Sequence, residues 1–322
     1  MRSTQIHHAV PLSAVKPLER LLSYRRHCLS ATRKALQGST HRRERSPVGG
    51  ARLEPCGEIE GLTYLRCPES GSLFLAELPD SRTWARLLAE VSEYRHSPEA
   101  FHSALTQSRT DTVYAPKLEW IQETLRLQGM SEPRILEAAT LPSDFTELLK
   151  MSASFSDVIT VDEMALAMDA AHRDQQRLAH VAVLLESLDR VDDPVALLRG
   201  ISRHLDEGGL LFVTALVCSG FDLAVLGLHN LYLYPPDRAN CFSLQGLSRL
   251  LEHEGFVLLE VSTPGVLDVE IILAHLHHDP ALPLSTFERQ LLDADGETHA
   301  AFQAFLQQQG LSSFARIVAR KR

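Results

Sequence analysis

Strand-like and helix-like segments alternate along the last two thirds of the chain, and this alternation constrains the fold more than any other feature. A short continuous apolar run is typical of a strand buried on both faces, whereas apolar residues spaced three or four apart are typical of a helix. Chains that alternate the two form a parallel sheet with helices on both faces. We therefore expect an α/β fold with a doubly wound sheet.

The expected elements can be placed from their apolar runs and from the residues that end them. The expected strands cover residues 134–138, 157–161, 180–185, 210–216, 256–261 and 315–319. The expected helices cover residues 115–129, 195–205 and 244–254, with further helical segments at 287–292 and 298–309. Asp193 and Pro194 are typical of a helix start, and Gly255 is typical of a helix end.

Charge is distributed unevenly along the chain. The net charge is −9 over 322 residues, yet residues 1–50 contain ten Lys or Arg and only two Asp or Glu. The rest of the chain is acidic and repels nucleic acid, so a polyanion could be bound only by the basic segment. Because Tyr24 is the only stacking aromatic there, nucleic-acid binding is not expected. We predict a flexible extension with one short helix near residues 12–36.

The longest apolar stretch, residues 208–228, approaches the length of a membrane span. Ser219-Gly220 interrupts it, and Asp222 would be costly inside a bilayer, so we expect a buried strand followed by a loop. Five scattered cysteines do not form a disulfide framework and are typical of a reducing compartment. The expected location is the cytoplasm.

Motifs in the second half point to a family. Residues 180–209 (HVAVLLESLDRVDDPVALLRGISRHLDEGG) end in a Gly-Gly turn before an apolar strand, and the segments 234–237 (YPPD) and 240–243 (NCFS) follow that strand. In order and content, residues 115–322 resemble class I S-adenosylmethionine-dependent methyltransferases, in particular a bacterial branch with an N-terminal zinc ribbon. The resemblance implies a Rossmann-like sheet of about seven strands whose last strand is antiparallel.

The resemblance also implies S-adenosylmethionine as the cofactor, bound at a glycine-rich loop after the first strand. Residues 137–143 read EAATLPS here, and Ala139, Leu141 and Ser143 stand at the three glycine positions, where side chains narrow the space for a ligand. Only about 18 residues separate the second strand from the fourth, so the adenine-side strand is expected to be missing and a helix is expected over 164–178. The cofactor-binding residues implied by the resemblance are Glu137, Ala139, Thr140, Asp162 and Glu186.

The ribbon-like module keeps too few ligands for zinc. Cys56 and Cys67 remain, and Ser70 stands where a second pair would close, whereas structural zinc requires four ligands. We therefore expect no zinc. His275, His277 and His278 cluster beside Asp279 without a spaced partner motif, so no metal site is expected there.

The resemblance places the methyl acceptor against the segment after the fifth family strand. The substrate-side candidates are Asp222, Tyr234, Asp237, Arg238 and Asn240. The family's histidine in this segment is replaced by Arg238, so the sequence identifies no catalytic acid or base.

The expected organisation is a basic extension over 1–50, a degenerate ribbon-like module and helical linker over 51–110, and a methyltransferase-like domain over 111–322 with a helical insertion at 265–312. Two functions stay open. The first is methyl transfer to a small-molecule or saccharide-type acceptor. The second is a catalytically degenerate scaffold that pairs with an active relative, another protein or a second copy. Membrane contact is not expected.

Overall fold

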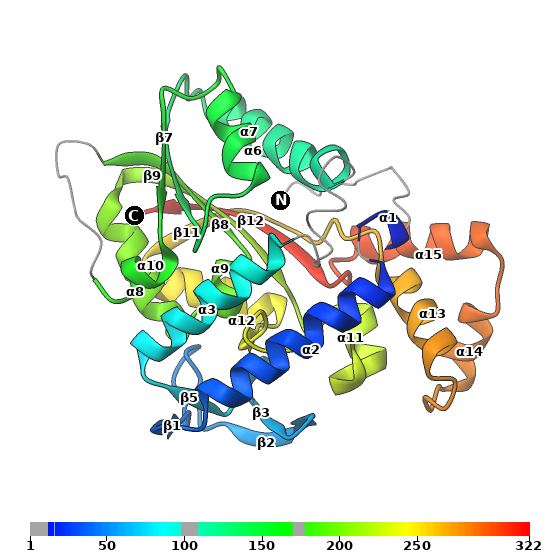
Figure 1. Ribbon diagram of the computed structural model, residues 1–322. Coiled ribbons are helices and arrows are strands. Elements are labelled where there is room, and N and C mark those ends of the chain that lie inside the picture. The colour runs from blue at the N-terminus through cyan, green and yellow to red at the C-terminus, as the bar shows by residue number, and fades with distance from the viewer. Residues whose placement is uncertain (1–11, 16, 98–108, 170–177) are drawn as a thin grey trace.

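A six-stranded sheet forms the centre of the computed structural model, which describes residues 12–15, 17–97, 109–169 and 178–322 (Figure 1). Its strands, in the order in which they pair, are β11 (Phe256–Ser262), β12 (Phe314–Lys321), β9 (Leu205–Leu216), β8 (Ala179–Leu185), β6 (Arg134–Ala138) and β7 (Asp157–Val161). The four strands from β9 to β7 pair in parallel, and β12 pairs antiparallel with both β9 and β11. The predicted α/β sheet with an antiparallel last strand is confirmed.

Alternating side chains of the sheet enter two separate hydrophobic clusters. Ile135, Val183 and Phe212 pack on one face, and Leu136 and Leu184 pack on the other. The first face is covered by η1 (Thr110–Tyr114), α6 (Ala115–Leu127) and α7 (Asp144–Met151). The second is covered by α8 (Glu163–Ala167), α9 (Ser187–Arg190), α10 (Pro194–His204) and α12 (Leu244–His253). Both faces are therefore buried, which explains the continuous apolar runs in the strands.

The sheet has one strand fewer than the expected number of about seven. β7 is its edge strand within the described part of the chain, in agreement with the predicted loss of the adenine-side strand. Residues 163–167 form α8, the start of the helix expected over 164–178. Residues 170–177 of that expected helix lie outside the described residues.

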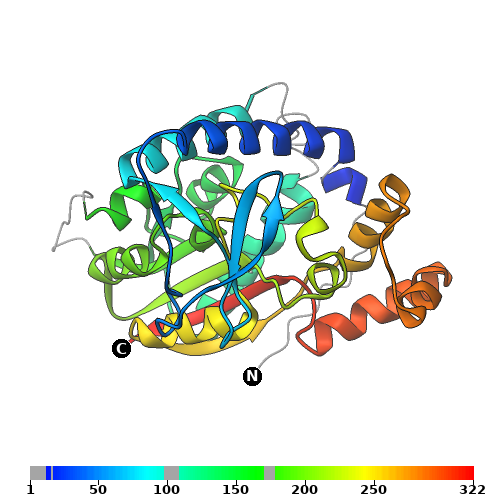
Figure 2. The ribbon, with the colours of Figure 1, turned by 90° about the horizontal axis from the view of Figure 1, so that it is seen from below.

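The N-terminal basic segment is folded against the body of the protein. After α1 (Leu12–Val15), α2 (Leu18–Ala35) runs beside α3 (Ser81–Arg95), and Figure 2 shows α2 and α12 on opposite sides of the molecule. Leu21, Tyr24 and Leu29 are buried in the main core. Residues 18–35 thus form a packed layer instead of a flexible extension, because their apolar side chains share one face of the helix.

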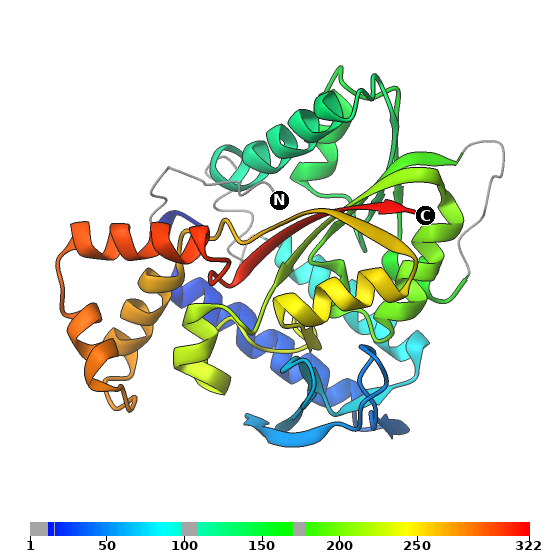
Figure 3. The ribbon, with the colours of Figure 1, turned by 180° about the vertical axis from the view of Figure 1, so that it is seen from behind.

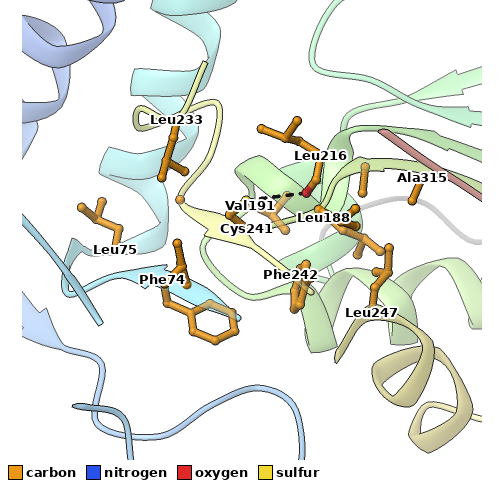
Figure 4. Packing of buried hydrophobic residues seen from close by; sticks show 14 of the residues in the cluster. Phe74, Leu75, Leu188, Val191, Leu216, Leu233, Cys241, Phe242, Leu247 and Ala315 are labelled. Atoms are coloured by element: carbon orange, nitrogen blue, oxygen red, sulfur yellow. Dashed lines mark hydrogen bonds between the residues drawn. The ribbon is translucent and has the colours of Figure 1, made fainter. Parts of the chain in front are cut away.

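The ribbon-like module shares a sheet with the segment that follows β9. This module contains β2 (Glu54–Ile59), β3 (Leu62–Arg66), β4 (Leu73–Leu75) and β5 (Glu77–Pro79), and β1 (Thr40–Arg42), which precedes the module, pairs with β5. β4 pairs with β10 (Asn240–Cys241), and the ring centroids of Phe74 and Phe242 lie 5.6 Å apart in an edge-on arrangement (Figure 4). The small sheet therefore fixes the segment that the sequence assigned to the substrate side.

Helices gather at one end of the molecule, on the left in Figure 3. They are α11 (Phe221–Leu226), η2 (Gly227–His229), α13 (Asp268–His278), α14 (Thr286–Leu292) and α15 (Gly296–Gln308). The helical segments predicted at 287–292 and 298–309 are confirmed by α14 and α15. Within the described ranges, every helix is too short or too polar to cross a membrane.

Packing of α10 on α8 gives a stability test. A Cβ atom added at Gly200 would collide with the carbonyl oxygen of Leu166, so the two helices would have to separate. Gly200→Ala should lower the free energy of unfolding by about 1–3 kcal/mol in chemical denaturation. Gly296→Ala is the control, because no atom lies within 4 Å of the added Cβ, and it should change that free energy by less than about 0.5 kcal/mol. Equal effects of the two substitutions would contradict this packing.

Candidate functional site

A pocket lies at the carboxyl ends of the parallel strands. The strand order reverses there, because β7 pairs with β6 on one side and β8 pairs with β6 on the other. Doubly wound sheets bind ligands at such a reversal of strand order. The cavity has a volume of about 130 Å³.

The loop after β6 forms one wall of this pocket. Ala139 donates its backbone N–H to the Val161 carbonyl at 3.0 Å, which ties the loop to β7. The half-buried Leu141 side chain, which stands at one of the three glycine positions expected from the sequence, lines the pocket. Ser143 begins α7, and its N–H donates to the Thr146 hydroxyl at 2.8 Å. The loop is therefore held by its own hydrogen bonds and narrowed by one apolar side chain.

The acid that faces the pocket after β7 is Glu163. Asp162, the residue expected from the sequence, accepts the Ala165 N–H at 2.7 Å as the N-cap of α8 and is not among the pocket-lining residues. Glu163 is fully buried, and its Oε1 accepts from the Thr140 hydroxyl at 2.8 Å and lies 3.7 Å from Arg190 Nε. Its Oε2 has no hydrogen-bond partner among the described residues.

Burial raises the pKa of the Glu163 carboxyl group, and Arg190 and the hydroxyls of Thr140 and Ser187 oppose that rise. Glu137 also lines the pocket, and burial raises its pKa as well, while the Thr160 hydroxyl lies 3.4 Å from its Oε2. The wall of the pocket next to β6 and β7 thus holds two buried carboxyl groups.

An ion pair between Arg238 and Glu186 crosses the pocket. Arg238 Nη2 donates to Glu186 Oε2 at 2.5 Å, and Lys117 Nζ lies 4.0 Å from the other oxygen of that carboxylate. Behind Arg238, at 3.4 Å, lies the fully buried Asp189. Burial raises the pKa of Asp189 to about 8, against the effect of Arg238.

A second ion pair joins the N-terminal layer to the pocket. Arg95 of α3 donates to both carboxylate oxygens of Asp237, at 2.6 and 2.5 Å, and to the Tyr24 hydroxyl at 2.9 Å. Burial would raise the pKa of Asp237, but the guanidinium groups led by Arg95 outweigh it and lower that pKa. Tyr234 is buried beside them with its ring centroid 6.2 Å from that of Tyr24.

Most of the residues selected from the sequence lie at this pocket. Those that line it are Glu137, Ala139, Thr140, Glu186, Tyr234, Asp237 and Arg238. Asp162, Asp222 and Asn240 do not line it. The lining residues that sequence reasoning missed include Arg95, Arg109, Lys117, Glu163 and Arg190. Glu163 directly follows a selected residue, whereas no local sequence signal marks Arg95 or Lys117.

Asp222 and Asn240 have buried structural roles. Asn240 donates to the carbonyls of Leu188 and Val191 at 2.8 and 2.7 Å and accepts from Arg43 at 2.6 Å. Asp222 accepts from the Leu223 N–H at 2.8 Å and from the Asn230 amide at 3.0 Å. They hold turns after β8 and β9 in place.

The histidine cluster on α13 lies outside the pocket. His275 is buried, and burial lowers its pKa. Across the described ranges, no group of three or more His, Cys, Asp or Glu side chains is arranged to hold a metal ion.

Asp222 makes folding stability depend on pH. Burial, with a further contribution from Asp268, raises its pKa to about 7. The folded protein therefore keeps a proton on Asp222 between about pH 4 and 7, where the unfolded chain has lost it, so stability falls as pH rises through this window. Asp222→Asn should reduce that fall, as measured by denaturation at pH 4.5 and 7.5.

The exposed Asp293 provides the matched control. Asp293→Asn should leave the change in stability between the two pH values as it is in the wild type. If Asp222→Asn leaves the pH dependence equally unaltered, Asp222 does not carry a proton in the folded protein.

Comparison with known proteins gives a family match and distant fold likenesses. A family model described as a methyltransferase domain matches residues 75–261, more than half of the chain. The plantazolicin methyltransferase BpumL, solved in complex with SAH, is 15% identical over 74% of this chain and 95% of that chain, with a TM-score of 0.43. A comparison with curated proteins gives no match.

Two further solved structures illustrate the range of these likenesses. A SAM-dependent methyltransferase from Thermotoga maritima is 17% identical over 62% of this chain and 88% of that chain, with a TM-score of 0.37. The [4+2]-cyclase SpnF is 17% identical over 59% of this chain and 76% of that chain, with a TM-score of 0.33. At such identities the likeness concerns the fold.

Proposed function

Because the chain belongs to the methyltransferase-domain family, whose cofactor is S-adenosylmethionine, we propose that it transfers the cofactor's methyl group to a small-molecule acceptor in the pocket above β6 and β8. One observation carries the proposal. Glu163 is a fully buried acid at the carboxyl end of the sheet, and its Oε2 has no partner among the described residues. An open buried acceptor is costly unless a ligand donates to it.

The pocket residues fit the chemistry of an adenosyl ligand. Glu163 can accept hydrogen bonds from ribose hydroxyls or from an ammonium group, and its contact with Thr140 holds it in position. When bound, S-adenosylmethionine supplies a methyl group already activated on a sulfonium. The chain itself then has to bind the reactants, orient them and exclude water.

The acceptor side of the pocket favours a polar molecule. Tyr234, Asp237 and Arg238 line it together with Tyr232, and all four are buried. Hydroxyl, carboxylate and guanidinium groups can hydrogen-bond the polar groups of a saccharide-type or similar small acceptor. These residues would position the acceptor atom against the methyl group.

A second candidate function is a catalytically degenerate scaffold. Two observations favour it: Leu141 places an apolar side chain in the pocket wall, and Asp162 caps α8 instead of facing the pocket. Both would weaken the binding of an adenosyl ligand. The scaffold would use the same sheet and N-terminal layer to hold a protein partner or a second copy.

Binding of S-adenosylmethionine separates the two functions. At about 100-fold excess over Kd, the cofactor should raise the free energy of unfolding by about 2.7 kcal/mol, which thermal denaturation detects. Glu163→Gln should weaken binding about tenfold or more, because the amide offers the ligand one acceptor oxygen where the carboxyl group offers two. Calorimetric titration of both proteins measures the two constants.

Glu252→Gln is the matched control, since Glu252 is an exposed residue of α12 outside the pocket. It should bind the cofactor as the wild type does. An absence of any thermal shift at millimolar cofactor would contradict methyl transfer and favour the scaffold. Equal affinities of Glu163→Gln and the wild type for the cofactor would show that Glu163 does not take part in cofactor binding.

A further inference from the structure

A second groove lies where α2, β2, η2 and α13 come together. It has a volume of about 470 Å³ and shares no lining residue with the pocket above β6 and β8. Ile59, Leu228 and Leu231 form its apolar lining, and its other lining residues are ionisable. The groove is therefore a separate candidate site, outside the residues assigned to methyl transfer.

His275 lines this groove, and both of its ring nitrogens are open. The residue is only 5% exposed, and neither Nδ1 nor Nε2 has a hydrogen-bond partner among the described residues. Leaving such a group buried without a partner is costly. An uncharged imidazole offers one acceptor nitrogen, and burial favours this form by lowering the pKa of His275, against the effect of Asp279. The groove thus contains a buried acceptor that a ligand can satisfy.

Two carboxylates of the groove are not paired with a cation. Glu60 is paired with Arg25 at 2.5 Å and with Arg33 at 3.5 Å. Glu58 and Asp279 form no ion pair within the described parts of the chain, and their hydrogen bonds come from uncharged donors. Both residues are exposed, so a ligand in the groove can reach their oxygens.

The end of α13 adds further acceptors. His278 is the last residue of this helix and Asp279 is its C-cap, and both line the groove. The last carbonyl groups of a helix carry partial negative charge and favour a cation nearby. Carboxylate, carbonyl and imidazole acceptors thus occur together here, a combination that suits a ligand with a positive charge and several N–H donors.

We propose that this groove binds the ammonium group of a small organic amine. The ammonium group donates to the open nitrogen of His275 and pairs with Asp279, and the alkyl part of the amine lies against Leu228 and Leu231. An ammonium group suits these acceptors because it has three donors and no acceptor. The inference goes beyond the proposed methyl transfer and does not depend on it, since the two sites have no residue in common.

Titration of the full chain with n-butylammonium chloride at about pH 8 and constant ionic strength tests the site, followed by NMR through the signals of the ligand and of the histidine rings. At this pH an alkylamine is protonated and an ordinary histidine is uncharged. Butylammonium should bind saturably and shift the ring signals of His275. n-Butanol and butyrate have the same chain length without the positive charge, and each should bind at least about tenfold more weakly.

Two substitutions test the named contacts. His275→Phe keeps an aromatic ring but removes both nitrogens, so it should weaken butylammonium binding about tenfold or more. His277→Phe is the matched control and should bind as the wild type does, because His277 is an exposed residue of the same helix outside the groove. Asp279→Asn should weaken binding several-fold, and it keeps the proposal testable if His275→Phe does not fold.

Several results would overturn the amine site. They are an absence of saturable binding, equal binding of n-butanol, and an affinity of His275→Phe or Asp279→Asn for butylammonium equal to that of the wild type. Saturating S-adenosylmethionine should leave butylammonium binding unchanged. Displacement of butylammonium by S-adenosylmethionine would assign the amine to the pocket above β6 and β8 and overturn a separate site.

Discussion

The ion pair between Arg238 and Glu186 is the contact on which the architecture of the pocket depends. Glu186 follows β8 with a φ of 60°, in the left-handed region that non-glycine residues rarely occupy, so its conformation must be held by its surroundings. Arg238 is itself anchored, because its carbonyl accepts from the Tyr64 hydroxyl at 2.8 Å. The pair therefore links the segment after β8, the segment after β9 and the N-terminal small sheet around one cavity.

The segment that carries Arg238 is held in place by α2, α3 and the small sheet, which explains why these N-terminal elements are part of the fold. Arg95, which also donates to the Tyr24 hydroxyl, holds Asp237, and Arg43 holds Asn240, so α2, α3 and the small sheet together position the segment after β9. At least one basic residue of segment 1–50, Arg43, therefore makes contacts inside the protein and does not only add charge to the surface. The ribbon-like module keeps its place through strand pairing and aromatic packing, which require no metal ligands.

Local patterns in the sequence predicted the framework well and the site only in part. The strand β6 and the helix α12 were placed within one residue of their bounds, because apolar periodicity and caps such as Ser243 act over a few neighbouring residues. Asp162 instead accepts the Ala165 N–H as the N-cap of α8, which is a local pattern that a binding role for Asp162 does not take into account. Arg95 lies 142 positions from Asp237 in the sequence, a separation that no local pattern spans.

A crystal structure with S-adenosylhomocysteine would locate the ligand relative to the buried Glu163. We expect a nucleoside above the carboxyl ends of β6 and β7, with Glu163 within hydrogen-bonding distance of the ligand and Leu141 against its edge. A pocket that stays closed around Leu141 at saturating ligand, or a ligand bound away from Glu163, would contradict it.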